Sequence, residues 1–168
     1  FFASRVGHVP AAIVRDGDGV LRGHVNVCRH RGHEVVSGEG NRRTLQCPYH
    51  AWTYGLDGCL RNAPRADREP DFPWEELSLV PLKVDSWGPF VFANADLDAP
   101  ALADVLGELP SIVAEAGVEI DALEFHRRRE WELAANWKVA IENYLECYHC
   151  PVAHPGFSAT IDVDVDSY

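Results

Sequence analysis

The sequence predicts an α+β chain in which an all-β domain of antiparallel sheets precedes the start of a second, α+β domain. Three observations support this fold class: short apolar segments flank glycine-rich turns in residues 1–97, helical periodicity begins at residue 99, and a capped helix is expected after Asn136. The composition changes in the stretch DLDAP, so we expect a first domain at 1–98, without its N-terminal part, and a truncated second domain at 99–168.

The strands of the first domain are predicted from their turn signals. Residues 9–28 read as a hairpin whose apolar halves flank Asp16-Gly17-Asp18-Gly19. Residues 44–62 repeat this pattern around Leu56-Asp57-Gly58, and residues 82–94 form a third pair of strands that bends at Trp87-Gly88-Pro89. The loops between these strands are therefore expected to be hairpin tips.

The second domain is predicted to begin with helices. Residues 99–116 have helical periodicity that is interrupted at Gly107 and Pro110. One further strand is expected at residues 123–133. A helix should then begin at the N-cap Asn136 and stop at Pro151.

Charge and composition restrict the partners of this chain. The formal net charge of −11 argues against nucleic acid and anionic membranes. No apolar stretch is long enough to span a membrane, and the N-terminus does not resemble a signal peptide. Five cysteines without regular disulfide spacing favour a reducing compartment, and we expect the cytoplasm. Because the chain opens with Phe1-Phe2 and contains no methionine, we expect a fragment or a processed form.

Two short segments each combine one cysteine with one histidine: CRHRGH at residues 28–33 and CPYH at residues 47–50. A structural zinc ion could accept the four side chains as a tetrahedral set. A Rieske-type [2Fe–2S] cluster would take both cysteines on one iron and both histidines on the other. The pattern suits the two-iron core, because each loop must then reach both irons. The four candidate ligands are Cys28, His30, Cys47 and His50.

The charge of such a cluster indicates its role. Two ferric irons, two sulfides and two thiolates sum to zero when the histidines are neutral, so this core accepts an electron more readily than a four-thiolate cluster. Nearby glycines would let backbone N–H groups approach the sulfur atoms, which raises the reduction potential further. One-electron transfer is therefore expected. These glycines are Gly32, Gly38, Gly40, Gly55 and Gly58.

The spacing of CRHRGH and CPYHAW resembles the cluster motif of Rieske non-haem iron oxygenases, the family of the aromatic-ring-hydroxylating dioxygenase α subunits. The resemblance implies that the two cysteines and two histidines bind a [2Fe–2S] cluster. His33 lies outside the motif and is expected to be solvated or hydrogen-bonded. Three aromatic side chains are expected in the core and around the cluster, and the hydroxyl of the third is a candidate for tuning a thiolate. They are Tyr49, Trp52 and Tyr54.

A second candidate site lies in NWKVAIENYLECYHCPVAH, residues 136–154. On one continuous helix, four side chains of this stretch would form a single stripe, and the chain would turn after Pro151 to bring His154 beside His149. Two histidines and an acidic residue form a facial triad that leaves positions on Fe(II) open for O2 and substrate. The spacing of the two histidines alone is a weak signal. The stripe consists of Glu142, Glu146, His149 and Cys150.

This stretch resembles the iron motif of the same oxygenase family, which begins with Asn-Trp-Lys, passes a Glu-Asn pair and ends in an acidic residue, Tyr-His and a second His. The resemblance implies that His149 and His154 bind Fe(II) and that Glu146 and Asn143 belong to the catalytic site. In the family, this acidic residue links an iron-ligating histidine to a Rieske histidine of a neighbouring subunit, which by position is His50. It is commonly Asp in members that act on aromatic rings, whereas members with Glu include oxygenases of quaternary ammonium compounds.

The resemblance implies an oxygenase with a Rieske domain and the start of an α+β helix-grip catalytic domain. Electrons would come from NAD(P)H through a reductase, with or without a ferredoxin. The iron would activate O2 for hydroxylation, dihydroxylation or demethylation of a small organic substrate, either an aromatic acid or ring or a quaternary ammonium compound. The complete protein would be a homotrimer, with or without a β subunit. It would use neither nucleic acid nor a membrane as a partner.

Three other interpretations stay open at this point. A Rieske electron carrier without substrate chemistry would need the first motif alone, and a zinc-stabilised binding module would need no iron. Cys147 and Cys150 are expected to pack as small apolar residues, with a redox or zinc pair as the alternative.

The third iron ligand of the family lies downstream, and the carboxylates of DVDVD (Asp162, Asp164 and Asp166) are expected to be a solvated strand face instead. The chain alone should therefore bind mononuclear iron weakly or not at all.

Overall fold

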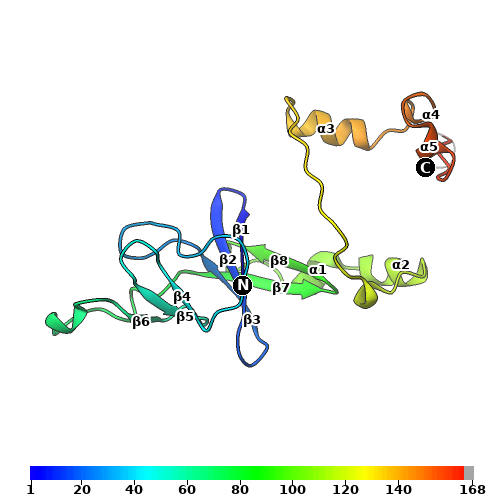
Figure 1. The fold of residues 1–168 in the computed structure, drawn as a ribbon. Helices are drawn as coiled ribbons and strands as arrows, with labels where there is room; N and C mark the ends of the chain where they lie inside the picture. Colours follow the sequence, from blue (N-terminus) through cyan, green and yellow to red (C-terminus); the bar gives the residue numbers. More distant parts are fainter. Residues whose placement is uncertain (165–168) are drawn as a thin grey trace. The chain divides into compact units, whose positions relative to one another are not determined.

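The computed structural model describes residues 1–164 and divides the chain into two compact units. The first unit comprises residues 1–125, and the second begins at His126. Each unit is described by itself, and Figure 1 shows the order of their elements.

The first unit contains a five-stranded antiparallel sheet in the order β1-β2-β3-β7-β8. The hairpin predicted at residues 9–28 is confirmed, with Asp16–Gly19 in its turn, and so is the pair bent at Gly88. The edge strand β1, which pairs with β2, was not predicted from the sequence. The strands are β1 (Phe2–Val6), β2 (Val9–Arg15), β3 (Leu21–Val25), β7 (Pro81–Trp87) and β8 (Phe90–Asn94).

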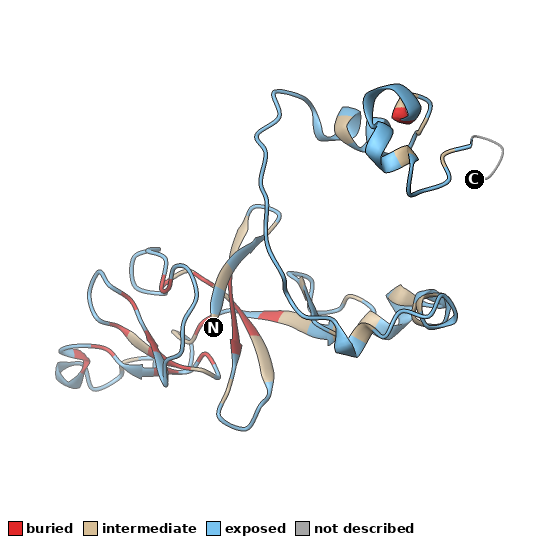
Figure 2. Ribbon diagram, turned by 45° about the vertical axis from the view of Figure 1, so that its right-hand side comes forward, coloured by how far each residue is buried: buried red, intermediate tan, exposed pale blue. Residues whose placement is uncertain are grey.

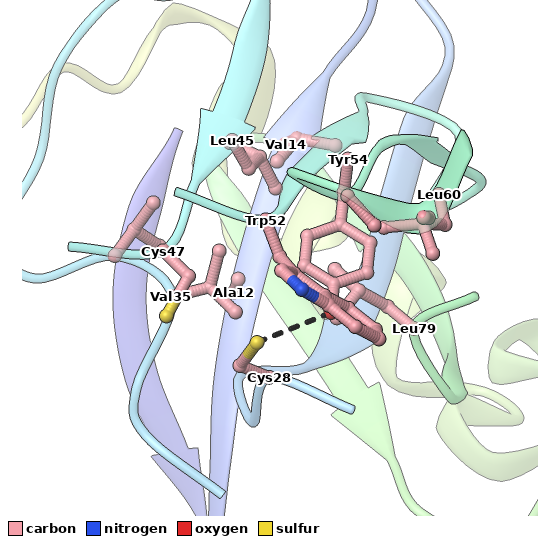
Figure 3. Close-up of a cluster of buried hydrophobic side chains, with 13 residues drawn as sticks. Ala12, Val14, Cys28, Val35, Leu45, Cys47, Trp52, Tyr54, Leu60 and Leu79 are labelled. Atoms are coloured by element: carbon pink, nitrogen blue, oxygen red, sulfur yellow. Dashed lines mark hydrogen bonds between the residues drawn. The ribbon is translucent and has the colours of Figure 1, made fainter. Parts of the chain in front are cut away.

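A second, three-stranded antiparallel sheet has the order β4-β5-β6, as the turn signals in residues 44–62 predict. Its Leu45 and Tyr54 are fully buried in the hydrophobic cluster that also contains Ala12 and Val14 of β2. Ala11 and Ile13 of β2 belong to a separate cluster, so β2 is buried on both faces. Figure 2 shows that the buried residues of this unit concentrate in its strands and the loops beside them, and Figure 3 shows the first cluster. The strands are β4 (Thr44–Gln46), β5 (Thr53–Gly55) and β6 (Leu60–Asn62).

The helical segment expected at residues 99–116 is present, but Pro110 does not interrupt it. The break lies at Gly107, which ends one helix, and Pro110 stands in the first turn of the next. Proline fits there because the first turn of a helix leaves its N–H groups unpaired anyway. The helices are α1 (Leu102–Leu106) and α2 (Leu109–Glu115), and two short 3-10 turns are η1 (Ala66–Arg68) and η2 (Ile120–Ala122).

The strand predicted at residues 123–133 is wrong, because residues 123–133 contain no strand in the structure. These residues are exposed, and no neighbouring segment pairs with their backbone among residues 1–164. A local sequence pattern alone cannot form a strand, since the N–H and C=O groups of a strand need a partner strand.

The single helix predicted from Asn136 to Pro151 is correct at its start and wrong at its end. The Asn136 side chain caps α3 (Trp137–Tyr144) by accepting a 3.0 Å hydrogen bond from the backbone N–H of Lys138. Helix α3 ends before Glu146, and Pro151 lies at the start of α4 (Cys150–Ala153), followed by α5 (Pro155–Ser158). The helical stripe expected for Glu142, Glu146, His149 and Cys150 is therefore wrong.

The described part of the chain, residues 1–164, contains no helix that is long and apolar enough to cross a bilayer.

His24 on β3 connects the two sheets of the first unit. Its ring is buried, and its Nε2 atom lies 2.9 Å from the carbonyl oxygen of Leu56, to which it donates a hydrogen bond. The ring also packs against Gly58, where an added Cβ would lie 2.7 Å from ring atoms in a backbone with φ of +84°. The Nδ1 atom is buried without a hydrogen-bond partner. Burial therefore lowers the pKa of His24 below its ordinary value of 6.5.

We expect this histidine to make the protein less stable in acid. The unfolded chain takes up a proton near pH 6.5 while the folded protein resists it, so the unfolding free energy falls as the pH drops below 6.5 towards the folded pKa. The slope from one proton is at most about 1.4 kcal/mol per pH unit. Urea unfolding between pH 5 and pH 8 should show a smaller acid loss for His24→Gln than for the wild type. The exposed His8→Gln serves as control, and an equal pH dependence in all three proteins would contradict the assignment.

Candidate metal centres

The two cysteine–histidine loops have the same backbone hydrogen-bond pattern. In the first loop, the Cys28 N–H donates to the His33 carbonyl (2.8 Å) and the Gly32 N–H donates to the Cys28 carbonyl (3.0 Å). In the second, the Cys47 N–H donates to the Trp52 carbonyl (2.8 Å) and the Ala51 N–H donates to the Cys47 carbonyl (3.0 Å). Each loop thus closes on its own cysteine and presents the histidine from its tip.

The fifth residue of each loop has a left-handed backbone, with φ of +73° at Gly32 and +59° at Ala51. Glycine adopts this conformation without cost, whereas a residue with a Cβ is strained by about 1–2 kcal/mol. Gly32 can be recognised from the sequence and Ala51 cannot, because alanine gives no signal for this conformation. Retained strain of this kind is typical of functional loops.

Asn26 supports the first loop and was also missed. Its side chain is fully buried, donates to the Val36 carbonyl (2.7 Å) and accepts from the Val35 and Val36 N–H groups (3.1 and 3.0 Å). It therefore holds the far end of the segment that begins at Cys28. A polar residue within the apolar run HVNVC was the one signal that could have indicated this role.

The four candidate ligands meet as two like pairs. The Cys28 and Cys47 thiols are both buried in one hydrophobic cluster, whereas His30 and His50 are exposed with ring centroids 4.6 Å apart. Among residues 1–164, no three His, Cys, Asp or Glu side chains converge on one ion, as a tetrahedral zinc would require. A two-iron Rieske core requires two protein ligands on each iron. The paired donors fit that core better than they fit zinc.

Hydrogen bonds and burial set the proton affinity of these donors. Burial raises the pKa of the Cys47 thiol, while N–H groups of Tyr49 and His50 donate to its sulfur. The glycines expected to provide such donors are therefore not the ones that bond to Cys47. Partial desolvation of the exposed His30 ring, with His50 and Arg31 beside it, lowers the pKa of His30, which favours the neutral imidazole that binds metals.

The aromatic residues around this site have different roles. The Trp52 ring is buried and stacks on the His30 ring, with centroids 4.9 Å apart and an angle of 7° between the planes. Tyr49, expected in the core, is instead 59% exposed and lies over His50, with ring centroids 3.8 Å apart. It follows the cysteine at the loop tip, where the core does not reach.

Tyr54 contacts the cysteine pair directly. Its hydroxyl oxygen lies 3.3 Å from the Cys28 sulfur and accepts a 3.0 Å hydrogen bond from the Arg29 N–H, so its own hydrogen is free to point at the sulfur (Figure 3). Burial raises the pKa of Tyr54, which keeps the hydroxyl protonated. The structure therefore favours the tuning role that the sequence analysis considered for this hydroxyl.

Replacing Tyr54 with phenylalanine is expected to lower the reduction potential of the bound cluster. A hydrogen bond to sulfur stabilises the reduced, more negative state, and a differential of about 1.4 kcal/mol corresponds to roughly 60 mV for one electron. Redox titration of the visible absorbance would measure the shift. Tyr49→Phe is the matched control. The exposed Tyr49 ring lies over His50 rather than beside a cysteine sulfur, so the loss of its hydroxyl should leave the potential unchanged. Equal potentials in the wild type and Tyr54→Phe would contradict the role.

The second candidate site forms where α3 is followed by a turn and two short helices. Glu146 Oε1 accepts a short hydrogen bond from His149 Nδ1, and Glu146 Oε2 accepts one from the Tyr148 N–H at 2.6 Å. The rings of His149 and His154 have centroids 5.3 Å apart at an angle of 75°. These residues line a cavity of about 700 Å³. Its walls are Ala140, Asn143, Tyr144, Glu146, Cys147, His149, Cys150, His154 and Phe157.

The hydrogen bond between this carboxylate and this histidine affects each partner in a different way. The hydrogen bond from His149 lowers the pKa of Glu146, so the carboxylate stays ionised. Because Nδ1 of His149 is occupied, Nε2 is the nitrogen left for a metal. Two histidines that face one cavity, one of them oriented by a carboxylate, fit part of an iron site.

A third metal ligand does not join the two histidines within residues 1–164. The strand expected for the DVDVD segment is not seen at Asp162 or Asp164, and Asp166 lies outside the described residues. Weak binding of mononuclear iron by this chain alone therefore stays a prediction.

Comparison with known protein families gives two matches along the chain. A model of the Rieske [2Fe–2S] domain matches residues 1–81. A model of the ring hydroxylating alpha subunit catalytic domain matches residues 120–168. The first contains the four candidate ligands of the cluster. The second contains Asn143, Glu146 and the two candidate iron ligands, His149 and His154.

Two oxygenases are similar in sequence to most of this chain. The oxygenase subunit of carnitine monooxygenase from Acinetobacter pittii is 47% identical over 90% of the chain. The chloroplastic choline monooxygenase of Beta vulgaris is 40% identical over 98% of it. The chain spans 41% and 38% of the lengths of these two proteins.

Solved structures agree with this relationship. The quaternary ammonium Rieske monooxygenase CntA with L-carnitine superposes with a TM-score of 0.87 at 44% identity, covering 97% of this chain and 47% of CntA. Naphthalene 1,2-dioxygenase with indole superposes with a TM-score of 0.80 at 29% identity, covering 93% and 36% of the two chains. The protein belongs to the Rieske non-haem iron oxygenase α subunits, with a Rieske [2Fe–2S] domain followed by part of the ring-hydroxylating catalytic domain.

Proposed function

We propose that this chain is part of a terminal oxygenase that activates O2 to oxidise a quaternary ammonium compound. The observation that carries the proposal is the presence of two separate donor sets on one chain, a paired cysteine–histidine set and a carboxylate-oriented histidine pair. An electron carrier would need only the first set. The boundary between the two domains is proposed at residues 97–101, where the composition changes.

The first donor set would hold the [2Fe–2S] cluster, with Cys28 and Cys47 on one iron and His30 and His50 on the other. His149 and His154 would supply two ligands of the mononuclear iron, and no third ligand joins them among residues 1–164. When bound, these groups supply one-electron transfer and the activation of O2.

The remaining side chains position these donors. Burial keeps water from the Cys28 and Cys47 sulfurs, and the stacked Trp52 ring fixes the plane of His30. Glu146 holds the Nδ1 proton of His149 and orients the ring. Asn143 lines the same cavity, and we propose that it lies at the catalytic site.

The partners follow from this function. We propose an NAD(P)H-dependent reductase, with or without a ferredoxin, as the electron source. A homotrimer, with or without a β subunit, is proposed for the complete protein, since a solved CntA structure at 44% identity is described as revealing inter-subunit electron transfer. The cytoplasm stays the expected compartment, because the five cysteines are free thiols and iron–sulfur ligands require reduced sulfur.

The substrate class is proposed from the relatives and from Glu146. The relatives at 47% and 40% identity are named for carnitine and choline, both quaternary ammonium compounds. Glutamate at position 146 also occurs in family members that act on such compounds. We therefore expect demethylation or hydroxylation beside a quaternary nitrogen rather than dihydroxylation of an aromatic ring.

The test uses the complete oxygenase subunit that contains this chain, loaded with iron and sulfide and supplied with NADH and a Rieske oxygenase reductase. Carnitine, γ-butyrobetaine and choline are compared with naphthalene by mass spectrometry of products and by O2 uptake. We expect product from at least one quaternary ammonium compound and none from naphthalene. A cluster that is reduced without product from any of the four would favour the electron carrier.

A further inference from the structure

The cavity of the second site contains two thiols that the proposed chemistry does not use. Cys147 and Cys150 line the same cavity, and the Cys150 N–H donates to the Cys147 carbonyl at 3.0 Å. A turn closed in this way keeps its first and fourth Cα atoms within about 7 Å. Disulfides span Cα distances of about 4.4–6.8 Å, so the pair can be joined with little backbone movement.

The two thiols differ in exposure. Cys147 is partly exposed in the cavity, whereas Cys150 is buried, and it is the one buried residue among the described residues of its unit. A small oxidant that enters the cavity therefore meets Cys147 first, with Cys150 in place behind it. Oxidation-sensitive cysteines typically combine an accessible thiol with such a resolving partner.

We propose that Cys147 and Cys150 form a reversible disulfide when the protein meets hydrogen peroxide. The Cys147 sulfur attacks the O–O bond, and one water leaves as the sulfenic acid forms. The Cys150 sulfur then attacks the sulfenic sulfur, the S–S bond forms and a second water leaves. Two thiols and one peroxide thus become one disulfide and two waters, with the two electrons passing from sulfur to oxygen.

The position of the pair gives this modification a consequence. Tyr148 and His149 lie between the two cysteines, so a disulfide encloses them in a small ring. The ring restricts the turn from which His149 faces the cavity. Peroxide would therefore act on the same turn that orients the candidate iron ligand.

The experiment treats the iron-loaded protein with a few equivalents of hydrogen peroxide, alkylates it with iodoacetamide and maps tryptic peptides. The tryptic peptide that begins at Val139 contains Cys147 and Cys150, with no other cysteine in residues 139–168, while Cys47 and Cys59 share the peptide Thr44–Arg61. We expect the Val139 peptide to resist alkylation and to be about 2 Da lighter than its reduced, unalkylated form. Dithiothreitol should restore both alkylation sites.

Variants separate this pair from the other thiols. In Cys150→Ser, Cys147 lacks its partner and should accumulate as sulfinic acid, about 32 Da heavier. Cys59→Ser removes an exposed cysteine from another peptide and should leave the disulfide unchanged. The proposal is overturned if both thiols of the treated wild type are still alkylated. It is equally overturned if wild-type Cys147 becomes sulfinic acid while Cys150 stays free.

Discussion

Replacing Cys47 with serine is expected to leave the protein without its [2Fe–2S] cluster. The Cys47 thiol is buried beside Cys28, and hydrogen bonds from the Tyr49 and His50 N–H groups already point at its sulfur. Serine would place a hydroxyl there, which is a poor ligand for iron compared with a thiolate. We expect iron and acid-labile sulfide to fall to background, together with the red-brown absorbance and the EPR signal of the reduced cluster.

The control for this experiment is Cys59→Ser. Cys59 is exposed and lies outside the two cysteine–histidine loops, so its variant should keep the full cluster content. Circular dichroism and gel filtration of both variants would separate loss of the cluster from loss of the fold. A Cys47→Ser protein that keeps its iron, sulfide and spectrum would refute the proposed ligand set.

Removing the two histidines of the second site is expected to stop product formation while the cluster remains. His149→Ala and His154→Ala each remove a proposed iron ligand. The loss of an outer hydrogen-bond partner alone costs about 10–100-fold in metal affinity or activity, so we expect a loss of at least about a hundredfold. Product formation, mononuclear iron content and the cluster spectrum should be measured together in the complete subunit.

His126→Ala is the matched control, because His126 is an exposed histidine of the same unit outside the cavity. It should keep both activity and iron. If His149→Ala and His154→Ala kept wild-type product formation, the catalytic role of this site would be wrong. If no variant or wild-type protein formed product while the cluster still cycled, the chain would be an electron carrier.

Both donor sets could be predicted from the sequence because their members lie close together along the chain. Cys28 and His30 share one short loop, as do Cys47 and His50, so spacing alone brings each cysteine near its histidine. The strands that carry these loops were predicted for the same reason, since a tight turn is determined by two or three residues. The strand at 123–133 failed because its pairing depended on a partner that the local pattern does not reveal.

Helix length in the second unit could not be read from periodicity either. The apolar spacing continues past Tyr144, but the structure turns there, and Glu146 accepts hydrogen bonds from Tyr148 and His149 instead. An acidic side chain that bonds to nearby N–H groups competes with the helix for its backbone. The turn brings Glu146 and His149 together, and their hydrogen bond agrees with the link between an acidic residue and an iron-ligating histidine that the family resemblance implies.

The sequence by itself determined the fold class and the family and predicted the two candidate donor sets, because residue type, spacing and turn chemistry are local properties of a chain. Only the tertiary structure decided that the thiols are buried while His30 and His50 are exposed, that Ala51 has a left-handed backbone, and that Asn26 holds the first loop. These features arise from packing between segments distant in sequence, such as β2 against the small sheet. Burial and hydrogen bonding depend on such neighbours, and they set the potentials and proton affinities on which the chemistry depends.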